Sequence, residues 1–103
     1  MKSLTIVVHT DDQQDLTNQL RTIEQVQRFT LNHIEDHGVE SEQDAFLSAR
    51  DEVVGASPRI RAETILQDSD LDTVLDALRD AKEGGKMKGA YYWVTAVEQE
   101  GPL

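Results

Sequence analysis

The 103-residue sequence predicts an α+β fold, a ferredoxin-like βαββαβ sandwich of one four-stranded antiparallel sheet and two helices. Three observations support this prediction. Four short segments are rich in β-branched or aromatic residues, and two others carry apolar residues at helical spacing. The two kinds follow one another in the order strand, helix, strand, strand, helix, strand. Right-handed crossovers then place both helices on one face of the sheet.

The first strand and helix are predicted close to the start of the chain. Residues 4–9, LTIVVH, are apolar and β-branched, as in a buried strand. Thr10 is placed to cap the following helix, with Gln13 three positions later to complete a capping box. We expect this helix over about 11–25, because its apolar residues recur at i, i+4 and i+7, at Leu16, Leu20 and Ile23.

The middle of the chain predicts a second strand and then a long connection. Residues 26–38 show strand-like alternation that is clearest from Phe29 to Leu31. The connection spans 38–58, and start and stop signals within it predict one short helix. The start signals are Ser41 and Asp44, the stop signals are Gly55 and Pro58, and the apolar face consists of Phe46, Ala49 and Val53.

The last part of the chain repeats the strand–helix–strand order. Residues 59–67 alternate as a third strand, and 89–99 predict the fourth. Between them a helix has Leu71, Val74, Leu75 and Leu78 on one face. Gly84 is a natural cap for its C-terminus. Residues 100–103 form a tail, and the length of 1–103 fits a single domain.

Both faces of the predicted sheet are apolar, although two helices can cover only one of them. The expected helix-facing residues are Leu4, Ile6, Val8, Ile60, Ala62, Leu66, Tyr92 and Val94. The opposite face carries Val7, Tyr91, Trp93 and Val97. Burying a large aromatic side chain stabilises a protein by about 1.5–3 kcal/mol. We therefore expect other subunits to cover the second face; the alternative is that the 38–58 connection folds over it.

Composition excludes several classes of function. The formal net charge is -10, so duplex nucleic acid and anionic membranes are unfavourable partners. The chain has no cysteine, which excludes disulfides, thiolate metal sites and cysteine catalysis. No apolar run is long enough for membrane insertion, and the start, MKSLTIVVHTDD, does not have the pattern of a signal peptide. We expect a cytoplasmic protein.

Two stretches resemble the PII-like signalling superfamily of small trimers, nearest an uncharacterised proteobacterial branch often encoded beside heavy-metal efflux pumps. They are SARDEVVGASPRIRAETIL (48–66), with its Arg-Ile-Arg, and AYYWVTAVEQEGPL (90–103), with its Tyr-Trp-Val and glycine near the end. The resemblance implies a homotrimer. It also implies that 38–58 takes the position of the T-loop, the arm with which such proteins engage their targets.

The resemblance further implies that the turn at 83–89 stands where the family's B-loop holds nucleotide phosphates between subunits. The sequence KEGGKMKG differs there from the Thr-Gly-x-x-Gly-(Asp/Glu)-Gly-Lys pattern of classical members. The residues themselves are compatible with an anion site, because glycines let backbone N–H groups converge and lysines add charge. The candidate effector-binding residues are Gly84, Gly85, Lys86 and Lys88, with Arg59 and Arg61 from a neighbouring subunit. The alternative is a helix cap followed by a turn with solvated lysines.

A second candidate site lies near the end of the second predicted strand. Its residues are His33, Glu35 and His37, which share one strand face because side chains alternate. Imidazole and carboxylate suit zinc, copper or nickel, and Glu42 or Asp44 could add a ligand. The alternative is a polar strand end with solvated histidines.

The 38–58 connection also contains the best candidate for partner binding. The residues concerned are Phe46, Leu47, Arg50, Val53 and Val54. An apolar helix face of this kind can enter a groove on a target protein. The alternative is packing against the protein's own trimer.

No spacing of Ser, His, Asp or paired carboxylates indicates a catalytic site, so we expect a protein that is not an enzyme and requires no cofactor. The favoured interpretation is a trimeric PII-like regulator. It would sense a small anionic effector, such as an adenine nucleotide, and control a target such as a membrane transporter. The alternatives are a metal-binding accessory protein linked to heavy-metal efflux, and a trimer without a ligand whose 38–58 connection only engages a partner.

Overall fold

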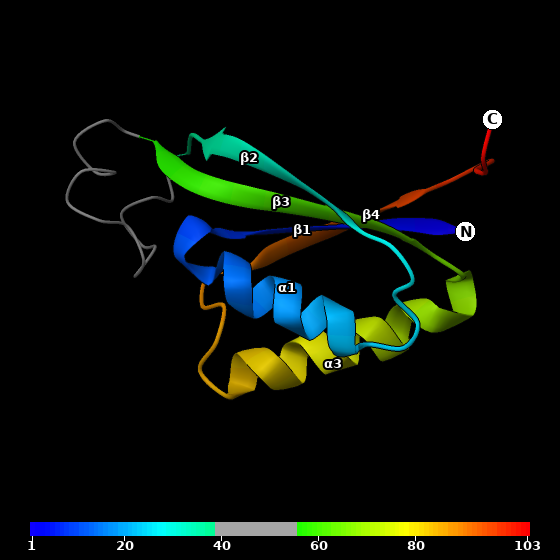
Figure 1. The fold of residues 1–103 in the computed structure, drawn as a ribbon. Helices are drawn as coiled ribbons and strands as arrows, with labels where there is room; N and C mark the ends of the chain where they lie inside the picture. Colours follow the sequence, from blue (N-terminus) through cyan, green and yellow to red (C-terminus); the bar gives the residue numbers. More distant parts are fainter. Residues whose placement is uncertain (39–55) are drawn as a thin grey trace.

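The computed structural model describes residues 1–38 and 56–103 and confirms the predicted ferredoxin-like α+β fold (Figure 1). The elements are β1 (Lys2–His9), the short 3-10 turn η1 (Thr10–Asp12), α1 (Gln13–Thr22), β2 (Thr30–Asp36), β3 (Ser57–Leu66), the 3-10 turn η3 (Asp68–Asp70), α3 (Leu71–Glu83) and β4 (Tyr91–Ala96). The short helix expected within 38–58 falls mostly on residues outside the described part of the chain.

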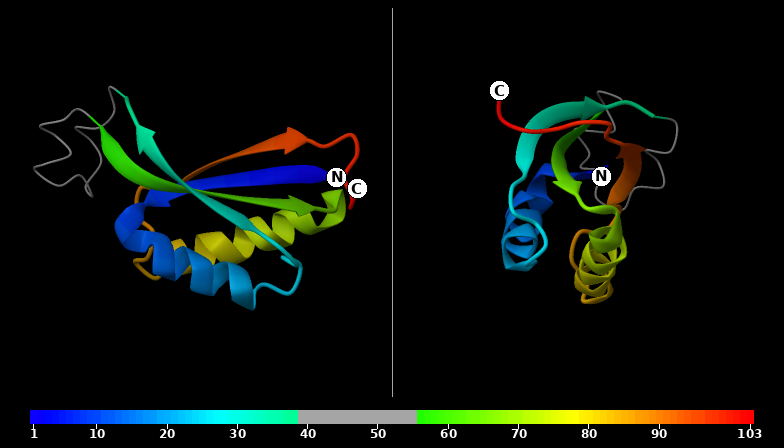
Figure 2. Two further views of the ribbon diagram at one scale, coloured as in Figure 1. Left: turned by 45° about the horizontal axis from the view of Figure 1, so that its top comes forward. Right: turned by 90° about the vertical axis from the view of Figure 1, so that its right-hand side faces the viewer.

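The four strands form one antiparallel sheet in the order β2-β3-β1-β4. Consequently β3 and β1 occupy the centre, while β2 and β4 are the two edges. Both helices lie against the same face of this sheet, and the two chain ends lie near the same end of it (Figure 2). The other face is covered by no helix within residues 1–38 and 56–103.

The core lies between the sheet and the two helices. Its buried members are Leu4, Ile6, Val8, Leu16, Leu20, Ile23, Ile60, Ala62, Leu66, Val74, Leu75 and Met87. The predicted inward positions of the first and third strands and the apolar stripes of both helices are thereby confirmed. Tyr92 is an exception, because 43% of it stays exposed on the edge strand β4. Val94 is only partly buried against the core.

The start of the first helix differs from the prediction. A 3-10 turn precedes it, and His9 rather than Thr10 caps that turn: His9 Nδ1 accepts a hydrogen bond of 3.1 Å from the backbone N–H of Asp11. Asp12 occupies the N-cap of α1 and makes no side-chain capping bond. Thr10 instead begins the 3-10 turn, and α1 starts only at Gln13. The helix also ends earlier than expected, because Ile23 already has extended backbone angles (φ −84°, ψ 113°).

Two predicted strands are shorter than expected, and two begin earlier, of which β1 begins at Lys2 rather than at residue 4. β2 starts at Thr30, so residues 26–29 form a connection from which Val26 and Phe29 pack against the core. β3 begins at Ser57, before the predicted residue 59. β4 ends at Ala96, so Val97 lies beyond the strand, where its N–H donates to the Met1 carbonyl (3.1 Å). No helix in the described ranges is long and apolar enough to cross a membrane.

Candidate functional site

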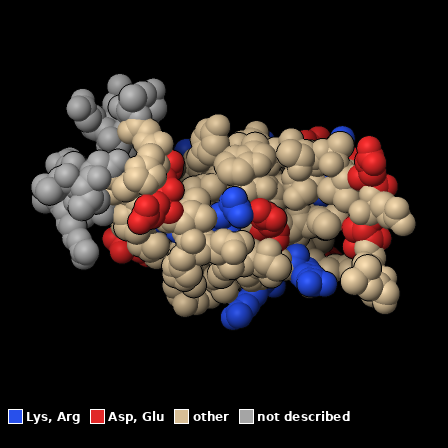
Figure 3. All heavy atoms as spheres, turned by 90° about the horizontal axis from the view of Figure 1, so that it is seen from above, with Lys and Arg blue, Asp and Glu red and all other residues tan. Residues whose placement is uncertain are grey.

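The uncovered side of the sheet, here called the open face, carries a few large apolar side chains among polar and charged ones. The register of the strands places on it Ser3, Thr5, Val7 and His9 of β1, Thr30, Asn32 and Ile34 of β2, Arg59, Arg61, Glu63 and Ile65 of β3, and Tyr91, Trp93 and Thr95 of β4. Figure 3 shows this face, most of which is formed by residues other than Lys, Arg, Asp and Glu.

Three large apolar side chains of the open face are exposed in the isolated chain. The exposed fractions are 65% for Tyr91, 39% for Trp93 and 45% for Ile65. The two aromatic rings lie 5.8 Å apart at 57°, a tilted pair of the kind that aromatic residues prefer. Val7 is different, since its neighbours on the face leave only 5% of it exposed. Of the residues predicted for this face, Tyr91 and Trp93 are exposed on it, Val7 is buried within it, and Val97 lies just beyond the end of β4.

The two arginines predicted to bind an effector occupy different environments on the open face. Arg59 is almost buried, and its Nε lies 3.6 Å from a carboxylate oxygen of Asp36. Arg61 is more accessible, with its Nε 3.2 Å from Glu63 Oε1. Arg61 is consequently the better placed of the two to meet a second molecule.

The glycine-lysine turn first serves to end α3. The backbone N–H groups of Gly84, Gly85 and Lys86 donate to the carbonyls of Asp80, Lys82 and Ala81 at 3.2, 2.9 and 3.4 Å. The predicted C-cap at Gly84 is thereby confirmed. Because these three amides already bind helix carbonyls, an anion at this turn would be held by the lysine side chains rather than by these N–H groups.

Beyond the cap, the turn alternates between left-handed and ordinary backbone conformations. The φ angles are 91° at Gly85, 53° at Met87 and 76° at Gly89. A left-handed conformation costs a residue with a side chain about 1–2 kcal/mol. Here it allows Met87 to enter the core, where only 4% of it is exposed. Lys86 and Lys88, on either side, are exposed.

The six predicted effector-binding residues form two separate groups within one subunit. The turn lies beside the edge strand β4, whereas Arg61 is on β3, two strands further in, in register with Val7 and Tyr91. Two strand spacings correspond to roughly 10 Å between backbones. Nothing within residues 1–38 and 56–103 brings the two groups together in one chain.

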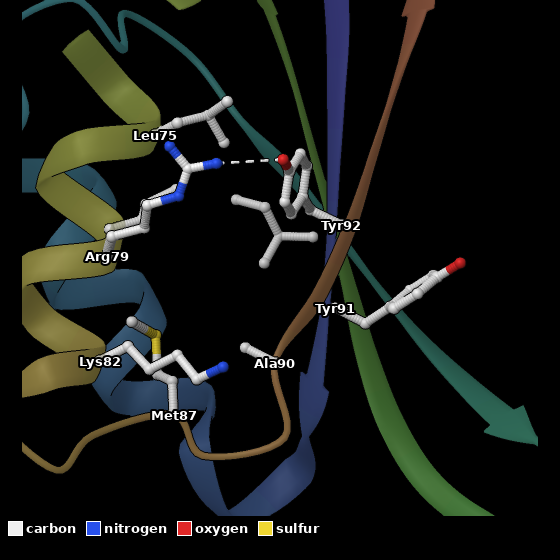
Figure 4. A pocket seen from close by; sticks show the side chains of 9 residues that line it. Leu75, Arg79, Lys82, Met87, Ala90, Tyr91 and Tyr92 are labelled. Atoms are coloured by element: carbon white, nitrogen blue, oxygen red, sulfur yellow. Dashed lines mark hydrogen bonds between the residues drawn. The ribbon is translucent and has the colours of Figure 1, made fainter. Parts of the chain in front are cut away.

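A pocket between α3 and β4, here called the α3–β4 pocket, was not anticipated from the sequence (Figure 4). Its cavity volume is about 150 Å³, and it is lined by Ile6, Leu75, Leu78, Arg79, Lys82, Met87, Ala90, Tyr91 and Tyr92. Arg79 Nη2 donates to the Tyr92 hydroxyl at 3.1 Å, and the guanidinium carbon lies 5.9 Å from the centre of that ring. Arg79 also pairs with Asp76 at 3.6 Å.

One feature of the sequence could have indicated this pocket. Four of the ten Lys and Arg residues lie within residues 79–88, in a chain whose formal net charge is -10. They are Arg79, Lys82, Lys86 and Lys88. Such a local concentration of positive charge attracts an anion even to an acidic protein. Periodicity alone could not reveal the cavity, because it does not show how far α3 stands from β4.

Of the three predicted metal ligands, His33 and Glu35 lie within β2 and His37 directly follows it, and two of them are in contact. Glu35 Oε2 is 3.3 Å from His37 Nε2, and both side chains are exposed. His33 shares the helix-side face of β2 with Glu35, opposite Ile60. In the described part of the chain no three His, Cys, Asp or Glu side chains are grouped to hold a metal ion. Residues 42 and 44 lie outside that part.

The predicted partner-binding residues also lie outside the described part of the chain. They are Phe46, Leu47, Arg50, Val53 and Val54.

Asp12, at the N-cap of α1, has an unusual environment. Burial raises the pKa of its carboxyl group, Asp15 raises it further, and His9 and Arg59 oppose the shift. One carboxylate oxygen of Asp12 is buried without a hydrogen-bond partner among the described residues.

Comparison with known proteins supports the fold and assigns a family. No curated protein matches the chain. Among solved structures 133 chains match. A shared fold does not by itself imply a shared function. One is the crystal structure of a DUF3240 family protein from Shewanella baltica OS155, with TM-score 0.76 and 19% identity over 99% of this chain and 94% of that one. The full length, residues 1–103, matches the family described as "Protein of unknown function (DUF3240)", and the chain therefore belongs to the DUF3240 family.

Proposed function

We propose that this protein is a trimeric PII-like regulator without enzymatic activity. In this proposal it works in the cytoplasm, requires no cofactor, and senses a small anionic effector in clefts between subunits. It then controls a partner, such as a membrane transporter, through residues 38–58. The observation that carries the proposal is the open face, on which Tyr91, Trp93 and Ile65 are exposed. The core lies on the other side of the sheet, so it cannot cover them.

The energetics of the open face favour association between copies. Full burial of an exposed large apolar side chain is worth about 1.5–3 kcal/mol, and each of these three gains the part that corresponds to its exposed fraction. The apolar residues belong to β3 and β4, so covering them requires a partner surface that extends across the sheet. Any closed arrangement of copies would satisfy this requirement on every subunit, whereas an open one would leave one face uncovered. The resemblance to the PII-like superfamily favours three copies.

The separation of the predicted effector residues supports a site between subunits. The lysines of the turn stand at one edge of the sheet, and Arg61 stands on the open face. Contact through open faces can bring the edge of one copy close to the arginine of another. Lysine and arginine together suit a phosphate group, as in an adenine nucleotide. Such an effector changes partner binding only if it binds one state of the protein more tightly than the other.

The oligomer is tested by light scattering during size-exclusion chromatography. We expect a mass three times the 11.6 kDa of one chain, at micromolar concentration. A folded 11.6 kDa monomer would overturn the proposal, since the inter-subunit clefts would not exist.

The effector is tested by calorimetric titration with ATP, ADP and AMP. We expect the double variant Lys86→Gln/Lys88→Gln to weaken binding, because it removes two exposed charges without altering the helix cap. Arg21→Gln is the matched control, since Arg21 is an exposed cation on the other helix. Absence of heat and of a thermal shift with every nucleotide would eliminate nucleotide sensing while leaving the trimer intact.

A second candidate function is metal binding as an accessory to heavy-metal efflux, and the contact between Glu35 and His37 favours it. A metal would need at least one further ligand, from His33, from residues 39–55 or from another copy. We expect Zn²⁺ to raise the melting temperature of the parent protein but not of the Glu35→Ala/His37→Ala variant. Equal shifts of the two proteins, or no shift at all, would exclude this site.

A further inference from the structure

We propose that the α3–β4 pocket binds a small aromatic carboxylate, with one benzene-sized ring inside the cavity and the carboxylate at its mouth. The site differs from the effector site proposed above, because it is formed within one subunit. None of the residues expected to bind the anionic effector lines it. The inference therefore does not depend on the oligomer or on nucleotide binding.

The interior of the pocket is suited to a ring rather than to a polar group. Much of its lining consists of the aliphatic side chains Ile6, Leu75, Leu78 and Ala90. The cavity volume of about 150 Å³ is close to that of engineered apolar cavities that remain dry and bind benzene. A ring of this size gains stability by leaving water, whereas an inorganic anion would lose its hydration without finding donors there.

Met87 provides a wall that favours an aromatic guest. Its φ of 53° is a conformation that residues with side chains rarely adopt, and it directs Met87 into the cavity lining. A thioether is polarisable and adaptable, and it makes favourable contacts with aromatic rings. Figure 4 shows Met87 below the cavity and Tyr92 beside it, while the ring of Tyr91 points away to the other side of β4. The guest ring would therefore lie between sulfur and phenol.

The mouth of the pocket supplies positive charge. Arg79 reaches across it from α3 toward Tyr92, and Lys82 extends from the next turn of the same helix (Figure 4). The present partners of Arg79 are a neutral hydroxyl and an exposed carboxylate of Asp76 at 3.6 Å. Exposed ion pairs of that kind contribute little. A bound carboxylate can accept two parallel N–H bonds from the guanidinium, which is a stronger and more directional interaction.

The ligand class follows from combining the two ends of the pocket. A ring without a charge would leave Arg79 and Lys82 unused, and a charged group without a ring would leave the apolar cavity empty. Phenylacetate has one ring and one carboxylate, separated by a single methylene, and is the probe we choose. Benzyl alcohol keeps the ring but has no charge, and acetate keeps the charge but has no ring.

The experiment is a titration of the ¹⁵N-labelled full-length protein followed by NMR. We expect phenylacetate to shift the amide signals of Met87, Ala90 and Tyr92 in a saturable manner, at concentrations up to about 10 mM. We also expect it to bind at least tenfold more tightly than benzyl alcohol or acetate. Arg79→Gln should weaken phenylacetate binding about tenfold and leave benzyl alcohol binding unchanged, because an ionised partner is worth about one power of ten.

Two further variants make the result specific to this pocket. Ala90→Leu fills the cavity and should abolish binding of both ring compounds, provided that its circular dichroism spectrum matches that of the parent. If Ala90→Leu does not fold, Arg79→Gln still decides the matter, because Arg79 is exposed and its replacement leaves the core intact. Arg21→Gln removes an equivalent charge from α1 and should bind phenylacetate like the parent.

Three results would overturn the inference. One is the absence of saturable shifts around Met87 and Tyr92. Another is equal affinity of the parent and Arg79→Gln for phenylacetate, which would show that the carboxylate does not contact the guanidinium. The third is equal binding of acetate and phenylacetate, which would indicate a simple anion site on the surface lysines. A protein that is monomeric or ignores nucleotides can still bind phenylacetate, so failure here is distinguishable from failure of the proposed regulatory function.

Discussion

Both faces of the sheet carry large apolar side chains, more of them on the helix side than on the open face, but the faces differ in what covers them. On the helix side, Leu4, Val8 and Ile60 are completely buried beneath α1 and α3. On the open face, Tyr91 and Trp93 remain exposed, although they belong to the same sheet. The difference shows that an apolar strand face does not by itself make a core. A core forms only where another element of the chain, or another molecule, supplies the opposing surface.

The largest expected effect comes from a cavity on the covered face. Leu20→Ala removes a fully buried side chain from α1, and we expect it to lower the free energy of unfolding by about 3 kcal/mol. Urea denaturation measures the change. The matched control is Ile65→Ala on the open face, where 45% of the side chain is exposed. At dilutions where the protein is monomeric the control should lose less than about 1 kcal/mol. Equal losses would mean that the two faces are covered alike.

The second prediction concerns the open face directly. Trp93→Ala should weaken association between subunits by at least about 2 kcal/mol, as expected for a central aromatic residue of an interface. Sedimentation velocity over a range of concentrations measures the shift toward monomer, and circular dichroism checks that the subunit stays folded. Arg28→Ala, an exposed residue outside the strands, is the control. If Trp93→Ala assembles like the parent protein, the open face is not the interface.

Most of the fold could be predicted from the sequence because it depends on local patterns. The i, i+4, i+7 spacing of Leu16, Leu20 and Ile23 identifies the buried face of α1 whatever the helix packs against. Element ends were less predictable, because tertiary contacts determine them. The 3-10 turn after β1 is stabilised by the buried His9 ring, and no propensity rule identifies histidine as the capping residue there.

The candidate sites were predicted less completely, and the reason is geometric. Sequence patterns identified the lysines of the turn and the arginines of β3, but they could not show that these groups stand apart within one subunit. They also could not show that the amides of Gly84 and Gly85 would bind helix carbonyls. The α3–β4 pocket depends on the left-handed backbone at Met87, a conformation for which methionine gives no signal.

A third prediction tests the intermediate case, an open-face residue that its own neighbours bury. Only 5% of Val7 is exposed, between Arg61 on β3 and Tyr91 on β4. Val7→Ala removes two methyl groups and should lower the free energy of unfolding by about 1.5 kcal/mol. Chemical denaturation of the monomer should place it between Ile65→Ala and Leu20→Ala. A cost below that of Ile65→Ala would show that the open face provides no packing before assembly.

The smallest effect is expected at Asp12, where the substitution changes charge rather than packing. Burial raises the pKa of Asp12, so the native state disfavours its carboxylate relative to the unfolded chain. This penalty is absent below the unfolded pKa of 3.8, because both states are then protonated, and it develops as the pH rises through the raised native pKa. Asp12→Asn removes the ionisation, so its melting temperature should exceed that of the parent by more at pH 7 than at pH 3.

The control for Asp12 must separate its local environment from the general repulsion in a chain of net charge -10. Glu24→Gln, at an exposed position just after α1, removes one negative charge without relieving burial. If Asp12→Asn gains no more stability than Glu24→Gln between pH 3 and pH 7, repulsion explains both gains. A larger gain for Asp12→Asn would mean that the fold itself disfavours the ionised carboxylate of Asp12. Arg59 already opposes the rise of the Asp12 pKa, so residues 56–59 would be the next to vary.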